Sequence, residues 1–174
     1  MNKYIRILLL AMFSALALTA CGPSDEEKQK AAAEAAAAEA RKPVPMPANT
    51  ADTAAWKNYL SRVVMNNMQG VKTNTPFMYF VPAGDSPELE DQRRSQLDNV
   101  SGTVARGVLP GNMMAFGGPD SKITADLIVE AFKEARDGSS KGVVFLFVGA
   151  AADNDRVKDA VTKSGVEYRF VEMK

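Results

Sequence analysis

The feature that most constrains the fold is an unbroken apolar run at residues 143–148, with the sequence Val-Val-Phe-Leu-Phe-Val. A run this short is typical of a β-strand, and only a strand covered on both faces can carry an apolar side chain at every position. Strands of this kind occur in parallel sheets whose two faces are covered by helices. We therefore expect residues 143–148 to lie at the centre of such a sheet.

Three further segments have the length and composition of strands. Residues 77–81 and 112–116 are short apolar runs rich in aromatic or methionine side chains. In residues 166–171, apolar positions alternate with Glu167 and Arg169, which is typical of a strand with one partly wet face. We predict that residues 77–81 are buried on both faces and that residues 166–171 form an edge strand.

Four segments with apolar residues at steps of three and four precede or separate these strands, and this spacing predicts amphipathic helices. Each segment begins near a residue suited to cap a helix N-terminus: Asp52 or Thr53, Ser86, Asp120 and Asp153. The predicted inner faces contain Trp56, Tyr59, Leu60, Val63, Val64 and Met68 in the first helix, Leu89, Leu97, Val100 and Val104 in the second, Ile123, Leu127, Ala131, Phe132 and Ala135 in the third, and Val157, Ala160 and Val161 in the fourth.

The alternation of strands and helices predicts a single α/β domain over residues 51–174, with a mainly parallel sheet of four strands. With the strands numbered along the chain, we expect the order 2-1-3-4, because this order places the two most apolar strands centrally and the alternating strand at an edge. Right-handed crossovers would then leave two helices on each face. The architecture is shared by proteins with many functions, so it implies no activity by itself.

The N-terminus has the organisation of an export signal. Two basic residues precede an apolar run, residues 7–18, and the run ends in residues 18–21, Leu-Thr-Ala-Cys. The run is shorter than the ~20 residues that a membrane span requires, which argues against a transmembrane helix. The segment resembles the signal peptide of bacterial lipoproteins, and residues 18–21 resemble its lipobox.

This resemblance implies that residues 1–20 are removed and that Cys21 becomes the mature N-terminus. The cysteine sulfur would carry a diacylglycerol and the new amino group a further acyl chain such as palmitate, which together would anchor the protein in a membrane. Gly22 stands where an aspartate would resemble the signal for retention at the inner membrane. We therefore expect an exported protein held by its lipid at the periplasmic face of the outer membrane.

Residues 21–50 are expected to be a tether. Alanine, glutamate and lysine predominate from Asp25 to Arg41 and favour a helix without an apolar stripe, while Pro43, Pro45 and Pro47 favour an extended stretch. Such a segment has too few large apolar side chains to offset the entropy lost on ordering.

Composition excludes several classes of function. The chain contains no histidine, and its one cysteine is assigned to the lipid, which argues against serine triads, cysteine nucleophiles and zinc sites built from histidine or cysteine. Acidic and basic residues are equal in number at 21 each, and loss of Lys3 and Arg6 with the signal would leave a net charge of about −2. We therefore expect no catalysis, no cofactor, no metal and no nucleic-acid binding.

The loops after the strands are the remaining candidate sites, because open parallel sheets bind ligands beyond the C-terminal ends of their strands. Two glycines before a helix can let an anion approach the backbone, and converging aspartates can bind Ca²⁺ or Mg²⁺ or act as an acid–base pair. The simpler interpretation is that these residues form turns and helix caps. The candidates are Asp85, Gly117, Gly118, Asp120, Asp153 and Asp155.

These observations favour a lipid-anchored, non-enzymatic envelope protein that binds a protein partner, such as a secretion or assembly component or a toxin that it antagonises. The alternative is a domain that binds a small ligand or an ion in the crevice at the strand ends, and the third hypothesis is an enzyme based on carboxylates. An exposed apolar surface away from the strand ends would favour the first hypothesis, and converging carboxylates would favour the other two.

Replacement of the lipobox cysteine tests the anchor. We expect Cys21→Ser to accumulate as an unlipidated precursor, because serine lacks the sulfur that accepts the diacylglycerol. Detergent phase separation checks this, and partition of the variant into the detergent phase like the wild type would contradict it. Sucrose-gradient fractionation of the wild-type protein then assigns the membrane.

Overall fold

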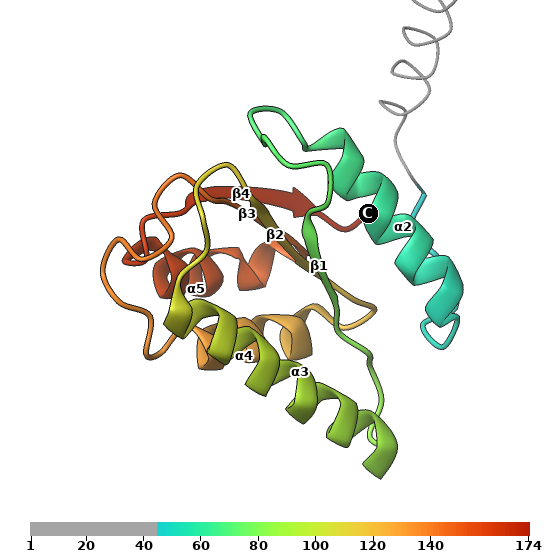
Figure 1. The fold of residues 1–174 in the computed structure, drawn as a ribbon. Helices are drawn as coiled ribbons and strands as arrows, with labels where there is room; N and C mark the ends of the chain where they lie inside the picture. The colour runs from blue at the N-terminus through green and yellow to red at the C-terminus, as the bar shows by residue number, and fades with distance from the viewer. Residues whose placement is uncertain (1–44) are drawn as a thin grey trace, which may run out of the picture. The chain divides into compact units, whose positions relative to one another are not determined.

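The computed structural model describes residues 45–174. The predicted signal peptide, Cys21 and the tether up to residue 44 lie outside the described residues, so the lipoprotein assignment stays a prediction. Figure 1 shows a twisted sheet with helices on both faces. Among residues 45–174, no helix combines the length and hydropathy required to cross a lipid bilayer.

The predicted alternation of helices and strands is confirmed. All four strands are parallel, and each differs from its predicted bounds by no more than one residue at either end. In chain order the elements are α2 (Thr53–Asn66), β1 (Phe77–Phe80), α3 (Pro87–Arg106), β2 (Met113–Gly117), α4 (Ser121–Ala131), β3 (Val144–Gly149), α5 (Ala151–Thr162) and β4 (Glu167–Glu172).

Three of the four helices begin at the predicted caps. The Asp52 carboxylate accepts a hydrogen bond from the Ala55 amide at the start of α2 (2.9 Å), and the Ser86 hydroxyl caps α3, which has a proline at its first position. Asp120 caps α4 in the same way. Asp153 does not cap α5, because that helix begins earlier, after Ala150, and has no side-chain cap.

The predicted strand order 2-1-3-4 is wrong, because the strands follow one another across the sheet in chain order, β1-β2-β3-β4. All five residues of β2 are buried, and β2 lies between β1 and β3. In β1, by contrast, the side chains of Phe77 and Met78 are both 44 % exposed. Residues 77–81 therefore form an edge rather than a strand buried on both faces, whereas the central position of β3 and the edge position of β4 are confirmed.

The order of the strands also decides where the helices lie. When each right-handed crossover steps in the same direction along a sheet, all the crossover helices fall on one face. The buried residues of α3, α4 and α5 form one core with alternate residues of the strands, and those of α2 form a second core with the residues between them. In the ribbon, α2 lies on the opposite side of the sheet from the other three helices (Figure 1). The expected arrangement of two helices on each face is therefore not found.

Strand periodicity divides the core in two. Phe145 and Phe147 of β3 point into the core under α3, α4 and α5, while Val144, Leu146 and Val148 point into the core under α2. The stripe predicted for α2 is largely confirmed, since Trp56, Tyr59, Leu60, Val63 and Val64 are buried. The Trp56 indole N–H of α2 donates to the carbonyl of Asn49 (3.0 Å), which lies in the segment before the helix, and so holds the incoming chain against α2.

This topology bears directly on the predicted crevice. In open parallel sheets, ligands bind where the strand order reverses and neighbouring crossovers turn to opposite faces. A sheet ordered β1-β2-β3-β4 has no such reversal. The crevice expected from the order 2-1-3-4 therefore loses its structural basis.

Candidate functional site

At the two glycines at the end of β2, the space that a side chain would occupy is taken by neighbouring residues of the domain. A Cβ atom on Gly117 would lie 2.9 Å from Leu60 Cδ1 and 3.2 Å from Val148 Cβ. A Cβ atom on Gly118 would lie 2.0 Å from the carbonyl oxygen of Val81, closer than real Cβ atoms approach. The space that we associated with an anion is thus occupied by side chains of α2 and β3 at Gly117 and by the Val81 carbonyl, directly after β1, at Gly118.

Asp120 acts as the cap of α4. Its carboxylate accepts a hydrogen bond from the Ile123 amide (2.9 Å), and its backbone carbonyl accepts one from the Thr124 hydroxyl (2.8 Å). The capping interpretation is therefore confirmed for this residue.

Asp153 links two helices instead of capping one. The Ser121 hydroxyl, at the start of α4, donates to one carboxylate oxygen of Asp153 (2.5 Å) and accepts from the Ala150 amide (2.7 Å). The other oxygen accepts from Nε and Nη2 of Arg156, at 3.0 and 2.7 Å. Asp153 therefore joins the N-terminal turns of α4 and α5 through Ser121.

Arg156 extends this link along α4. It forms an ion pair with Asp126 (Nη1–Oδ1, 2.5 Å) and donates to the carbonyl of Lys122 (3.1 Å). Burial would lower the pKa of Arg156, but its hydrogen bonds and charge interactions with Asp126 and Asp153 raise it above the usual value. Partial burial would raise the pKa of Asp126, but Lys122 and Arg156 hold it below the usual value. These charges thus stabilise one another between the two helices.

Asp85 and Asp155 are exposed. Asp155 accepts a hydrogen bond from the neighbouring Asn154 amide group (2.9 Å), and Asp85 lies in the loop that Arg93 holds through the carbonyls of Pro82 and Gly84. Across residues 45–174, no group of three or more acidic or cysteine side chains is arranged to bind a metal ion. The six sequence candidates are thus not assembled into a set of metal ligands.

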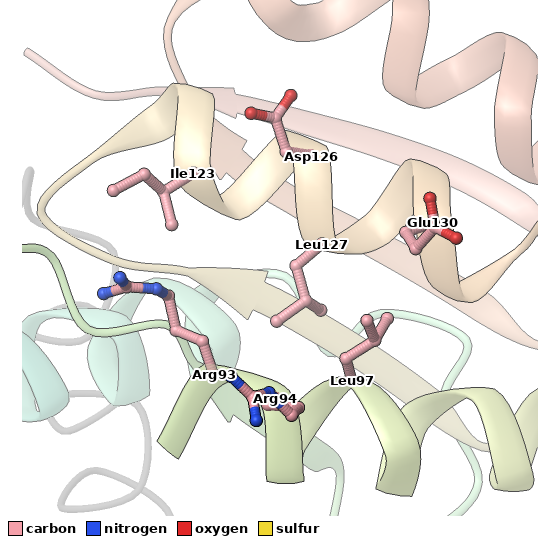
Figure 2. Close-up of a pocket in the computed structure, with 7 residues that line it drawn as sticks. All are labelled: Arg93, Arg94, Leu97, Ile123, Asp126, Leu127 and Glu130. Atoms are coloured by element: carbon pink, nitrogen blue, oxygen red, sulfur yellow. The ribbon is translucent and has the colours of Figure 1, made fainter. Parts of the chain in front are cut away.

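Sequence reasoning missed a groove that opens between α3 and α4 (Figure 2). Leu97 and Leu127 point toward each other between the two helices, and Ile123 extends the apolar lining. The groove has a volume of about 420 Å³. It is lined by Arg93, Arg94 and Leu97 of α3 and by Ile123, Asp126, Leu127 and Glu130 of α4.

The second surface that sequence reasoning missed follows β1. Phe77 and Met78 are exposed on this strand, and Met65 of α2 is 66 % exposed beside it. Met65 and Met78 line a cleft of about 500 Å³, together with Ser61, Val64, Met68, Asn74, Thr75 and Pro76. We call Met65, Met68, Pro76, Phe77 and Met78 the β1 surface.

The contacts of the two capping candidates predict unequal effects of substitution. Asp120→Asn keeps an oxygen for the Ile123 amide and should cost less than ~1 kcal/mol of unfolding free energy. Asp153→Asn removes the charge that binds Arg156 in a site where the Asp153 side chain is 15 % exposed, and should cost about 1–3 kcal/mol. Chemical denaturation of the two variants measures the difference, and equal losses would contradict the assigned link between α4 and α5.

Two glycines provide a matched test of the packing at the end of β2. Gly118→Ala should lower the unfolding free energy by at least about 2 kcal/mol, because the new methyl group would meet the Val81 carbonyl. Gly102→Ala lies inside α3 and meets only the flexible end of Arg106, so it should raise stability by roughly 0.5–1 kcal/mol. Thermal denaturation distinguishes the two variants, and a neutral Gly118→Ala would show that the strand ends are not tightly packed.

Comparison with known proteins gives no relative from which a function could be transferred. No protein-family model, no curated protein and no solved structure matches the chain. The function must therefore be argued from the chain's own residues.

Proposed function

We propose that the protein is a lipid-anchored, non-enzymatic component of a bacterial envelope that binds a protein partner in the groove between α3 and α4. The observation that carries this proposal is an apolar groove flanked by side chains of opposite charge, whose lining residues all belong to the helices α3 and α4 rather than to the loops at the strand ends. Leu97 and Ile123 are only half-buried there, so an apolar group seated in the groove would remove them further from water.

The charges on the two sides of the groove indicate the chemistry of the partner. Arg94 makes only a long ion pair with Asp91 (3.7 Å), and its side chain is 71 % exposed. On the other side Glu130 pairs with Lys133, but its side chain remains 51 % exposed. A complementary segment would present an acidic group to Arg94, a basic group to Glu130 and apolar side chains between them. An amphipathic helix meets these requirements.

The anchor comes from the sequence. The lipobox and Cys21 support attachment to the periplasmic face of the outer membrane, and residues 21–50 would hold the domain at a distance from it. A protein fixed in this way meets envelope proteins, which is why we propose a secretion or assembly component, or a toxin that this protein antagonises, as the partner.

Binding of a small ligand or an ion at the strand ends is less well supported. Asp120 and Asp153 both accept hydrogen bonds from the protein's own groups, and neighbouring residues fill the space beside Gly117 and Gly118. An enzyme based on these carboxylates meets the same objection. Association with a protein requires none of these residues to be free.

Charge reversal at the groove tests the proposal. Arg94→Glu should weaken capture of the partner from the native envelope about tenfold, equivalent to ~1.4 kcal/mol, because it places like charges opposite each other. Lys158→Glu makes the same change of charge at an exposed position of α5, away from the groove, and should leave capture unchanged. Both variants should keep the wild-type melting temperature.

A photo-crosslinking residue in place of Ile123 then locates the contact. Irradiation of intact cells should yield one dominant adduct from position 123 and none from the control position Lys158. Capture insensitive to Arg94→Glu, together with no adduct from position 123, would reject the groove as the binding site.

A further inference from the structure

The outer edge of β1 has backbone groups directed away from the sheet. The Val81 amide donates to the carbonyl of Gly117 (2.9 Å), so Val81 faces β2. In a strand that pairs on one side, alternate residues face the partner and the residues between them face away. Met78 and Phe80 therefore direct their N–H and C=O groups outward. The hydrogen bond from Gln96 Nε2 to the carbonyl of Phe80 (2.9 Å) independently places that carbonyl on the outer side.

Only part of this edge is occupied. Gln96 satisfies the Phe80 carbonyl, and beyond it Arg93 donates to the carbonyl of Pro82 (3.1 Å). Continued by two residues toward the N-terminus, the alternation also directs the carbonyl of Pro76 outward. The remaining groups of this edge make no hydrogen bond with any residue in 45–174. They are the carbonyl of Pro76, the amide and carbonyl of Met78, and the amide of Phe80.

This set of donors and acceptors is complementary to itself. In an antiparallel pair centred on Met78, the two Met78 residues exchange both N–H···O bonds. Each Phe80 amide then meets the Pro76 carbonyl of the other copy. The same register places the Pro76 nitrogen, which carries no hydrogen, opposite the Phe80 carbonyl, which already accepts from Gln96. In this register, each of the free N–H groups named above therefore faces a free C=O group of the other copy.

We propose that two copies of the chain associate through antiparallel pairing of their β1 strands about a two-fold axis at Met78. The pairing joins the two four-stranded sheets into one continuous sheet. The pairing does not depend on the groove between α3 and α4, because none of the residues that line this groove belongs to β1.

The side chains on the face under α3, α4 and α5 fit the same register. A row of aromatic rings crosses this face from Tyr79 to Phe116, Phe145 and Tyr168, with centroids 4.7, 5.0 and 6.1 Å apart. The register places Phe77 of one copy directly opposite Tyr79 of the other, at a closely spaced pair. The exposed Phe77 would thereby extend the row and lose contact with water.

The face under α2 contributes apolar surface as well. The two Met78 side chains would lie opposite each other on that face, with Met65, Met68 and Pro76 lining the adjoining cleft. Methionine adapts its shape to such contacts. Pairing would therefore bury the exposed apolar residues of the β1 surface together with the backbone.

The two edges of the sheet differ in the way expected if only β1 pairs. Residues 73–84 contain no charged side chain, whereas β4 carries Glu167, Arg169 and Glu172. Arg169 donates to the carbonyls of Asn67 and Gln69, at 2.6 and 2.7 Å, across the α2 side of β4. Charged residues on an edge strand prevent association with another strand. The β1 edge lacks this protection.

A single introduced cysteine tests the pairing in the full-length protein in its own envelope. Cys21 is the sole natural cysteine and is assigned to the lipid, so Met78→Cys adds one free thiol. A hydrogen-bonded antiparallel pair separates Cα atoms by about 5.5 Å, within the range of a disulfide. Non-reducing electrophoresis of oxidised cells should show at least tenfold more disulfide-linked dimer than Leu109→Cys, whose native side chain is 77 % exposed. A yield equal to that of Leu109→Cys overturns the proposal.

Two further measurements do not rely on folding of the cysteine variant. Wild-type mature lipoprotein in nonionic detergent should sediment with two chains per micelle at concentrations of about 10–100 μM, and monomers throughout this range overturn the proposal. Phe77→Lys should convert the dimer to monomer, because it brings an ammonium group to each side of the junction, whereas Leu109→Lys should leave the dimer intact. Arg94→Glu should also leave the dimer intact, which separates this surface from the groove of the proposed function.

Discussion

The rest of the structure depends on the requirement that β2 and β3 be covered on both faces. Every residue of the two strands is buried, so each face of the sheet needs its own helical layer. The crossover helices α3, α4 and α5 cover one face because they connect strands in an unbroken order. The second face is covered by α2, which connects no strands and precedes the sheet in the chain. The domain is thus a three-helix layer, a sheet and one helix.

Much of the local structure could be predicted from the sequence, because helix caps and apolar periodicity are set by neighbouring residues. Ser86, Pro87 and Asp120 mark helix starts that the structure confirms. Strand order depends on which strands pair across long intervals, and here apolar content was misleading. The aromatic run at residues 77–81 indicated a central strand, yet β1 is an edge on which Tyr79 is buried and Phe77 is exposed. The row of rings across one face explains its composition better than burial on both faces does.

The candidate site shows the same limit. An aspartate in a loop can cap a helix, bind an ion or pair with an arginine, and the sequence does not distinguish these roles. Asp120 caps α4, whereas Asp153 binds Ser121 and Arg156, because α5 begins at a point that the sequence pattern does not mark. The contact between Arg156 and Asp126 joins residues 30 positions apart on different helices, so no local motif could reveal it. Sequence reasoning missed the groove between α3 and α4 because the apolar residues that line it belong to the helical stripes that were assigned to the core.

The position of α2 in the chain has a consequence for the order of folding. Its apolar stripe packs mainly on Met113 and Ala115 of β2 and on Val144, Leu146 and Val148 of β3, which follow α2 by about half the length of the domain or more. Closing such long loops is entropically costly and slows folding. A chain that emerges from a membrane N-terminus first would therefore expose Trp56 and Leu60 until β3 has also crossed. In a chain exported in this way, α2 would thus be among the last of the described helices to find its partners, and during that interval it would offer a chaperone an apolar face.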